Sequence, residues 1–431
     1  MPKHPFLSAI LSVALLATVR ADAAEANAAA PKAPPEEDLT LFPIPNYKGD
    51  FWTRDAMLGD LGFRTALAQH GIQLEVDLNQ IYQGVVAGGR PGRSTNWEYS
   101  GSADYVLKLD TGKAGLWPGG FLTIHGKTFY GDPTSLATGS LLPTNTDFAL
   151  SDPHGEGTYL PHVYFTQFLT EKLAISFGKL DTTVGDDNAF AHGTGVEGFM
   201  NLGFCFNPVT LLTSPYSTLG AGLMYLPNDK VTLGFSVFDT DGDIRDAGFD
   251  TLFKGATTFA GDIAVKTRFF DHPGTQRLAV MVSSGDFTSL RQDPRVLEPD
   301  LGVTPVSRSS TWAIAYNFDQ YLTENWGIFG RVGVSDGKAN IFQTFYSIGV
   351  GGKGIIPGRD NDRFGVGLYY AGIADSLVSP LLNKSERGLE IFYDVAVTPW
   401  FSVTADVQVT SPVLKSADTA TVLGLRGRIR F

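Results

Sequence analysis

Three arginines at alternate positions near the C-terminus are the side chains in this chain whose spacing most clearly suggests ligand binding. Arg426, Arg428 and Arg430 alternate with apolar or small residues up to the terminal Phe431. Successive side chains of a β-strand point to opposite faces, so this pattern predicts one arginine face and one apolar face. Guanidinium groups carry five hydrogen-bond donors in a fixed fork, which suits a ligand rich in hydroxyls. A soluble β-sandwich would produce the same pattern in this strand alone.

A second candidate, an acidic segment, has part of the spacing of a calcium-binding loop. Asp239, Asp241 and Asp243 are spaced as in an EF-hand, but Ile244 stands where that loop needs glycine and Asp250 where it needs glutamate. The segment also follows an expected strand instead of a helix. We therefore expect a solvated acidic loop, with a weak divalent-ion site as the alternative.

Sequence motifs for catalysis or cofactor binding are absent. His125, His154, His162 and His192 show no metal-ligand spacing, and there is no Ser-His-Asp order, P-loop or glycine-rich nucleotide motif. The sequence therefore predicts no enzyme, no metal and no cofactor. The single Cys205 cannot form an internal disulfide, so we expect a buried structural thiol. The net charge of −12 argues against a nucleic-acid partner.

The N-terminus predicts export from the cytoplasm. Lys3 and His4 precede an apolar stretch, and Ala21-Asp22-Ala23 provides a small-x-small cleavage site. These features predict a cleaved signal peptide over residues 1–23. An uncleaved anchor is the alternative, although the apolar stretch is short for a membrane span.

Two further segments precede the strands. Residues 24–50 are rich in Ala, Pro and Glu, and this composition predicts a disordered periplasmic leader. Residues 51–71 predict a short periplasmic helix segment, with Asp60 as its cap and Gly71 at its end.

Alternation with period two begins at Ile72 and continues to the end of the chain. It predicts about sixteen strands, each near the ~10 residues that a tilted strand needs to cross a bilayer. They are expected at 72–83, 98–109, 120–130, 158–169, 172–180, 218–226, 231–239, 259–270, 276–285, 309–319, 325–335, 343–352, 363–372, 388–398, 401–410 and 421–431. No later stretch reaches the roughly 18 consecutive apolar residues of a membrane helix, so a membrane location requires a closed barrel.

Short and long connections alternate between these strands. The short ones include 170–171 and 399–400, whereas the longest are about 131–157, 181–217 and 285–308. Barrels of the Gram-negative outer membrane have short periplasmic turns and long external loops, and a Greek-key sandwich would not keep that order. We therefore predict an all-β, transmembrane, antiparallel up-and-down β-barrel over residues 72–431, surrounded by outer-membrane lipid and lipopolysaccharide.

Two local motifs resemble the carbohydrate-selective porins of the OprB family. Residues 58–72 are similar to that family's N-terminal motif, which has Gly-Asp, then Gly and Arg-Thr, a short helix, and Gly-Ile opening the first strand. Leu61 replaces the Trp that usually follows Gly-Asp. Phe177 to Asp181, followed by Phe199 to Asn201, resembles the family's strand and third-loop region. The resemblance extends from Trp52 to the C-terminus. It implies a sixteen-stranded channel, narrowed by inward-folded external loops, through which monosaccharides such as glucose diffuse into the periplasm.

Strand parity then assigns side chains to the lumen. Because a barrel closes on itself, Glu75 and Asp77 of the first strand lie beside the arginine strand, with Asp406 on its other side. These carboxylates could hold the guanidinium groups in place for sugar hydroxyls, while Phe392 and Tyr369 offer rings for stacking on a sugar. The alternative is that the charges pair only to stabilise a water-filled barrel. The candidate sugar-binding residues lining the pore are Arg426, Arg428, Arg430, Arg331, Glu75, Asp77, Glu390, Asp394, Asp406, Phe392 and Tyr369.

These observations lead to one main functional hypothesis and two alternatives. The main hypothesis is facilitated diffusion of glucose-like monosaccharides. The first alternative is a general, weakly anion-preferring porin whose arginines set only charge selectivity, and the second is a barrel enzyme such as an outer-membrane lipase. We expect small carbohydrates as ligands, and the barrel-assembly machinery as a partner that recognises the C-terminal strand. The sequence leaves monomer and homotrimer open.

Overall fold

The computed structural model describes residues 41–92, 97–150, 156–183, 186–252, 254–290, 297–298, 302–303, 307–377 and 380–431. The expected signal peptide and residues 24–40 of the expected leader lie outside these ranges. Among the described residues, no helix is both long and apolar enough to cross a membrane.

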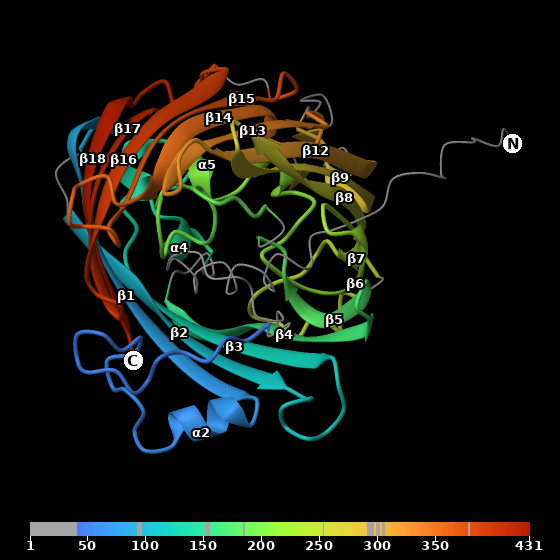
Figure 1. Ribbon diagram of the computed structural model, residues 1–431. Coiled ribbons are helices and arrows are strands. Elements are labelled where there is room, and N and C mark those ends of the chain that lie inside the picture. The colour runs from blue at the N-terminus through green and yellow to red at the C-terminus, as the bar shows by residue number, and fades with distance from the viewer. Residues whose placement is uncertain are drawn as a thin grey trace, which may run out of the picture.

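Sixteen of the described strands form one closed antiparallel barrel, in which each strand pairs with its neighbours along the chain and β1 pairs with β18 to close the wall (Figure 1). All sixteen predicted strands are present. Their bounds are β1 (Ile72–Gly89), β2 (Trp97–Asp110), β3 (Gly120–Gly131), β4 (Gly157–Thr170), β5 (Leu173–Asp181), β6 (Ser217–Asn228), β7 (Val231–Asp239), β8 (Thr257–Phe269), β9 (His272–Thr288), β12 (Ser307–Tyr321), β13 (Trp326–Ser335), β14 (Phe342–Lys353), β15 (Arg363–Ile373), β16 (Ser385–Thr398), β17 (Phe401–Ser411) and β18 (Asp418–Arg430).

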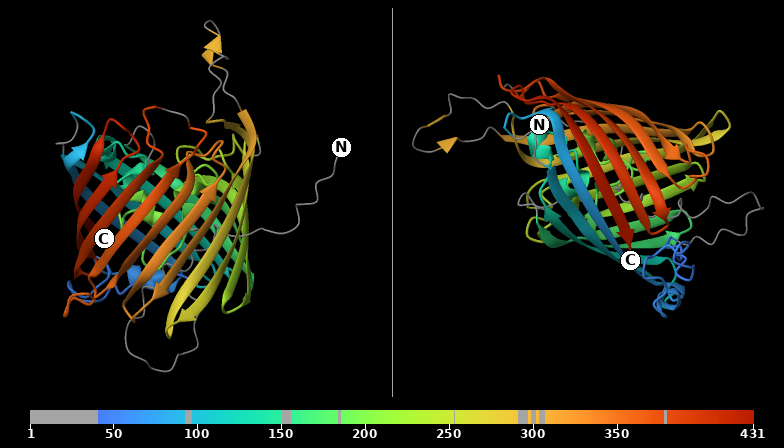
Figure 2. Two further views of the ribbon diagram at one scale, coloured as in Figure 1. Left: turned by 90° about the horizontal axis from the view of Figure 1, so that it is seen from above. Right: turned by 90° about the vertical axis from the view of Figure 1, so that its left-hand side faces the viewer.

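Several strands run past the predicted ends at the rim of the long loops. The first strand, for example, continues to Gly89, where two register shifts interrupt its pairing with β18. A separate two-stranded ribbon of β10 (Leu297–Glu298) and β11 (Gly302–Val303) lies in the loop between β9 and β12. Figure 2 shows the tilted wall and this ribbon beyond one rim.

The two faces of the wall follow the predicted alternation. Leu425 is 52% exposed on the outer face, whereas the next residue, Arg426, is 2% exposed. Leu368 and Tyr369 on β15 differ in the same way, at 55% and 4%. Apolar side chains on the outer face suit the lipid, and the inner face carries polar and aromatic groups.

The segment before the barrel packs against the rim that carries the short turns. Its helix, α2 (Arg64–Gln69), receives support from Asp60, because the backbone N–H of Thr65 donates to Asp60 Oδ1 at 2.7 Å. Residues 41–50 differ from the expected disordered leader. Phe42 and Tyr47 are buried, since Phe42 packs edge-on against Phe121 of β3 and the guanidinium of Arg64 lies over the Tyr47 ring. These aromatic contacts outweigh the polar composition of the leader.

Two external loops fold into the barrel, as the family resemblance implied. One carries α3 (Ser135–Thr138) and α4 (Thr146–Ala149), and the other carries α5 (Leu202–Cys205) and the 3-10 helix η2 (Pro208–Thr210). Figure 1, which looks along the barrel, places α4 and α5 within the ring of strands. We call residues 182–216, between β5 and β6, the inner loop.

The largest apolar core of the molecule lies between this inner loop and the wall of the barrel. Phe199 of the inner loop packs edge-on against Phe329 and Phe392, with ring centroids 5.4 and 4.9 Å apart. Cys205 belongs to the same core, and burial raises the pKa of its thiol to about 12. The expected buried structural thiol is therefore confirmed.

Candidate functional site

A cluster of half-exposed charges lies where the inner loop meets the closing seam of the barrel. Its members are Asp77 on β1, Glu197 on the inner loop, Arg363 on β15, and Arg428 and Arg430 on β18, and we call it the seam cluster. Glu197 receives an ion pair from all three arginines, at 2.5 Å from Arg363 and 2.7 Å from Arg430. Arg428 Nη2 also lies 2.5 Å from Asp77 Oδ2. The side chains keep between 14% and 35% exposure, so polar atoms of this cluster remain accessible.

Barrel closure thus brings Asp77 to the arginine strand, as the sequence predicted. Glu75 behaves differently, because it pairs with Lys108 of β2 at 3.0 Å instead of with an arginine. Glu197 was missed because it belongs to a loop, where strand parity gives no information.

Arg426 is buried, unlike Arg428 and Arg430 of the same strand. It donates to the backbone carbonyls of Gly195 and Gly198 at 2.7 and 3.0 Å, and to Thr404 Oγ1 at 2.9 Å. Its donors are therefore used to hold the inner loop against the wall. Asp406, expected beside this arginine, lies opposite Gly424 in the strand register and accepts a hydrogen bond from Gln408.

Most of the other expected residues are likewise buried against the inner loop. Glu390 accepts hydrogen bonds from the backbone N–H groups of Met200 and Asn201 at 2.6 and 2.9 Å. Asp394 accepts one from the Thr404 hydroxyl at 2.7 Å. The expected residues that are buried are Arg331, Tyr369, Glu390, Phe392, Asp394, Asp406 and Arg426. As placed, these side chains shape the loop that narrows the barrel and do not form the surface of the open lumen.

The two expected aromatics have a packing role in this arrangement. The Phe392 ring packs against Phe199, and the Tyr369 ring lies 5.6 Å from Phe204. Glycines on the neighbouring strands leave room for them, because a Cβ on Gly365 would lie 2.3 Å from Phe392 Cε1 and one on Gly388 would lie 2.2 Å from Tyr369 Cε1. Neither ring offers a face for stacking on a sugar.

A second polar region, which the sequence reasoning missed, lies on the other side of the inner loop. A cavity of about 60 Å³ opens between the loop and strands β8, β9 and β12. This volume accommodates a few water molecules or one edge of a small ligand. The polar residues that line it are Thr182, Thr183, Asp186, Asn207, Thr210, Ser214, Tyr216, Asp262, Arg277 and Asn317. Apolar side chains such as Phe206 and Met281 form the larger part of its surface.

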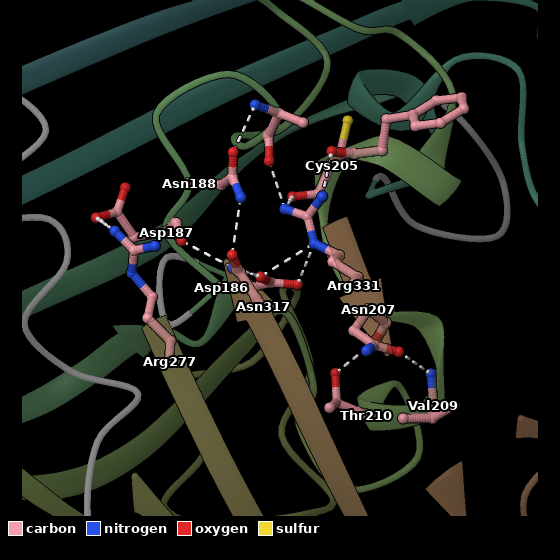
Figure 3. A network of polar contacts seen from close by, with 12 residues as sticks. Asp186, Asp187, Asn188, Cys205, Asn207, Val209, Thr210, Arg277, Asn317 and Arg331 are labelled. Atoms are coloured by element: carbon pink, nitrogen blue, oxygen red, sulfur yellow. Dashed lines mark hydrogen bonds and ion pairs between the residues drawn. The ribbon is translucent and has the colours of Figure 1, made fainter. Parts of the chain in front are cut away.

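Figure 3 shows the hydrogen-bond network beside this cavity. Arg277 lies 3.3 Å from Asp187 of the inner loop. It also lies 2.5 Å from Asp319 of β12. Arg331 pairs with Asp186 at 2.9 Å and donates to the carbonyl of Phe204 at 3.1 Å. The two arginines therefore position the start and the middle of the inner loop.

Asp262 is the member of this lining that has an acceptor to spare. Its Oδ1 atom is buried and accepts no hydrogen bond from any described residue. Period-two alternation could have placed both Asp262 and Arg277 on the inner face. Arg277 precedes the outward-facing Leu278 on a predicted strand. It pairs with Ala264, which lies two residues after Asp262 and therefore on the same face of the wall. A buried acceptor without a partner beside a guanidinium suits a ligand hydroxyl, which can donate and accept.

The acidic segment from Asp239 to Asp250 shows no metal-binding arrangement. Asp241 accepts from the backbone N–H of Ala256 at 2.7 Å, and Asp243 pairs with Arg245 at 2.6 Å. The hydrogen bond from Arg245 lowers the pKa of Asp243. Within the described residues, no group of three or more His, Cys, Asp or Glu side chains is arranged to hold a metal.

Comparisons with known proteins agree with this architecture. The family model described as carbohydrate-selective porin, OprB family, matches residues 95–431, which excludes the N-terminal motif at 58–72. The high-pH structure of OprB from Pseudomonas putida aligns with a TM-score of 0.77 and 19% identity, over 89% of this chain and 100% of that one. The low-pH structure of the same protein aligns with a TM-score of 0.55 and 16% identity, over 88% and 99%. These likenesses show the fold. A search of curated protein sequences found no match.

Proposed function

We propose that this chain, which belongs to the carbohydrate-selective porins of the OprB family, lets glucose-like monosaccharides diffuse through the outer membrane into the periplasm. Membership of that family and the closed barrel establish an outer-membrane channel for sugars. What we propose beyond this is a preference for monosaccharides over larger sugars.

The observation that carries the proposal is the cavity between the inner loop and β8, β9 and β12. A pyranose ring presents hydroxyls that both donate and accept, so a selective passage needs fixed donors and acceptors close together. Arg277 supplies the donors, and Asp262 supplies an unpartnered acceptor. The volume of about 60 Å³ admits one edge of one ring, which favours monosaccharides over longer chains.

The balance of charge argues against the alternative of a general anion-preferring porin. In the seam cluster, two carboxylates accompany three guanidinium groups. Beside the cavity, Arg277 is accompanied by Asp187, Asp262 and Asp319. The seam cluster alone has one guanidinium group in excess, but the two regions together hold five carboxylates and four guanidinium groups. An anion pathway needs an excess of positive charge, whereas mixed donors and acceptors suit hydroxyls.

Liposome swelling with sugars of graded size tests the proposal. Vesicles that contain the purified barrel should swell quickly in glucose and galactose and slowly in sucrose and maltose. A reversal potential near zero in a KCl gradient should accompany this preference. Equal swelling in mono- and disaccharides, together with a clear anion preference, would instead support the general porin.

A further inference from the structure

Two histidines that are 37 positions apart in the sequence meet on the inner wall of the barrel. His125 on β3 and His162 on β4 are direct cross-strand partners. Their Nδ1 atoms lie 3.1 Å apart, and their ring centroids lie 5.1 Å apart. Spacing along the chain did not suggest a ligand pair, because the register between the two strands creates it.

Each imidazole has a carboxylate on its far side. His125 Nε2 lies 2.7 Å from Asp104 Oδ1, and His162 Nε2 lies 3.5 Å from Asp181 Oδ2. The carboxylate of Asp104 keeps the ring proton of His125 on Nε2, which leaves a lone pair on Nδ1. His162 Nε2 makes no hydrogen bond with any described residue, and the two Nδ1 atoms lie within hydrogen-bond distance, so His162 donates its Nδ1 proton to His125 in the metal-free barrel. A cation that displaces this one proton has both Nδ1 atoms as ligands.

The surrounding charges also favour a cation. Lys127 lies 2.9 Å from Asp104 and 2.6 Å from Asp147, and its side chain is 1% exposed. Together with Asp181, this makes three carboxylates around the two ammonium groups of Lys127 and Lys179. Lys179, on the neighbouring strand β5, donates to the carbonyls of Ile244 and Asp246. A divalent cation between the histidines would offset the negative excess.

We propose that His125 and His162 together bind a divalent transition-metal ion such as Zn²⁺ through their Nδ1 atoms. Two nitrogens at the usual Zn–N distance in a tetrahedral site are separated by about 3.3 Å, close to the separation present here. Imidazole ligands suit Zn²⁺, Cu²⁺ and Ni²⁺ better than Ca²⁺ or Mg²⁺. Water fills the remaining positions, since the His125 side chain is 19% exposed.

The carboxylates act from behind the ligands, as in many zinc sites. The ion would tie β3 to β4 where the loop that carries Asp147 packs against the wall. The site borders both other regions, because Asp104 lies across from Asp77 of the seam cluster in the strand register and the His162 ring packs edge-on against Tyr216, which lines the cavity.

Calorimetric titration of Zn²⁺ into the EDTA-treated, detergent-solubilised full-length barrel tests the site. The expected result is one zinc ion per chain. His125→Gln and His162→Gln should each weaken binding about tenfold or more, and Asp104→Asn should weaken it about 10–100-fold through the lost hydrogen bond behind His125. His70→Gln is the matched control, because His70 is exposed at the end of α2 and should leave binding unchanged.

Electron paramagnetic resonance of the wild-type barrel with one equivalent of Cu²⁺ needs no variant. It should show coupling to two imidazole nitrogens. The proposal is overturned if the wild type binds no zinc, so that the pair holds only a shared proton. Zinc binding that survives both histidine substitutions, or a copper spectrum without two coupled nitrogens, overturns it as well.

Discussion

At the scale of single residues, Arg277 has the geometry of a ligand-binding side chain whose position is already fixed. Asp319 holds one side of its guanidinium group at 2.5 Å, and the longer 3.3 Å contact to Asp187 is the weaker of the two. The side chain keeps 16% exposure, so its remaining donors can reach the cavity. A guanidinium held by a carboxylate loses little entropy when it binds a hydroxyl.

Replacing Arg277 with Gln should weaken sugar binding in the channel. A hydrogen bond to a charged group contributes about 1.5–3 kcal/mol, so the glucose concentration that half-blocks ion current should rise roughly tenfold or more. Current-noise analysis in a planar bilayer measures this concentration. Arg245→Gln is the control, since Arg245 is half exposed and pairs with Asp243 in the external loop between β7 and β8. An unchanged blocking concentration in Arg277→Gln would place the sugar elsewhere.

At the scale of elements, the inner loop is held by side chains of the wall that reach its backbone. Glu390 accepts from two successive N–H groups, and Arg426 donates to two carbonyls of the same loop. Glu386 binds the other inward loop similarly, accepting from the backbone N–H groups of Leu141 and Leu142 at 2.6 and 3.1 Å. The narrowing of the barrel thus depends on buried charges that never touch the lumen.

Glu390→Gln should loosen the inner loop. An amide offers one acceptor oxygen in place of two, so one buried N–H group loses its partner, at a cost of about 1–3 kcal/mol. Single-channel conductance should rise and fluctuate, and the temperature of heat-induced unfolding should fall. Glu171→Gln, in the exposed turn between β4 and β5, provides the comparison. If Glu390→Gln kept the low and steady conductance of the wild type, the loop would be held by its apolar core alone.

The short turn between β14 and β15 predicts a pH dependence of stability. Although burial raises the pKa of Asp362, hydrogen bonds from Arg359, the Tyr393 hydroxyl and the Ala396 N–H hold it below its ordinary value. A lowered pKa means that the ionised group stabilises the folded state above its unfolded pKa. This contribution is lost as the pH falls through the folded value.

Asp362→Asn should therefore destabilise the barrel at neutral pH and matter little in strong acid. Unfolding temperatures of wild type and variant, followed by mobility on unheated gels, should differ at pH 7 and converge once the pH has fallen through the lowered pKa of Asp362. Asp360→Asn is the neighbouring control, because Asp360 is exposed in the same turn. If the difference in unfolding temperature persisted undiminished in acid, the ionised form of Asp362 would not be what stabilises the turn.

At the scale of the whole molecule, the sequence predicted the wall far better than its contents. Period-two alternation reports which residues face lipid, so all sixteen strands and the pairing of Asp77 with the arginine strand could be found. It cannot report what lies against the inner face. Arg426 and Arg428 share that face, yet the first is buried by inner-loop carbonyls and the second is 14% exposed beside Glu197.

The partners of inner-face residues come from loops with no periodicity. Glu197 and Asp187 reach the wall because the inner loop folds inward. No local sequence pattern predicts which wall residue each of them contacts. The meeting of His125 with His162 depends on the exact register of β3 with β4, including a shift after His125. Such features follow from the closed barrel as a whole.

We propose that the channel selects monosaccharides by hydrogen bonds at the cavity between the inner loop and the wall. The most direct test compares liposome swelling in glucose and in sucrose for the wild type and for Asp262→Ala, which removes the carboxylate and with it the unpartnered acceptor. The wild type should admit glucose several times faster than sucrose, and the variant should lose most of this preference. Equal rates for both sugars in the wild type would contradict the account.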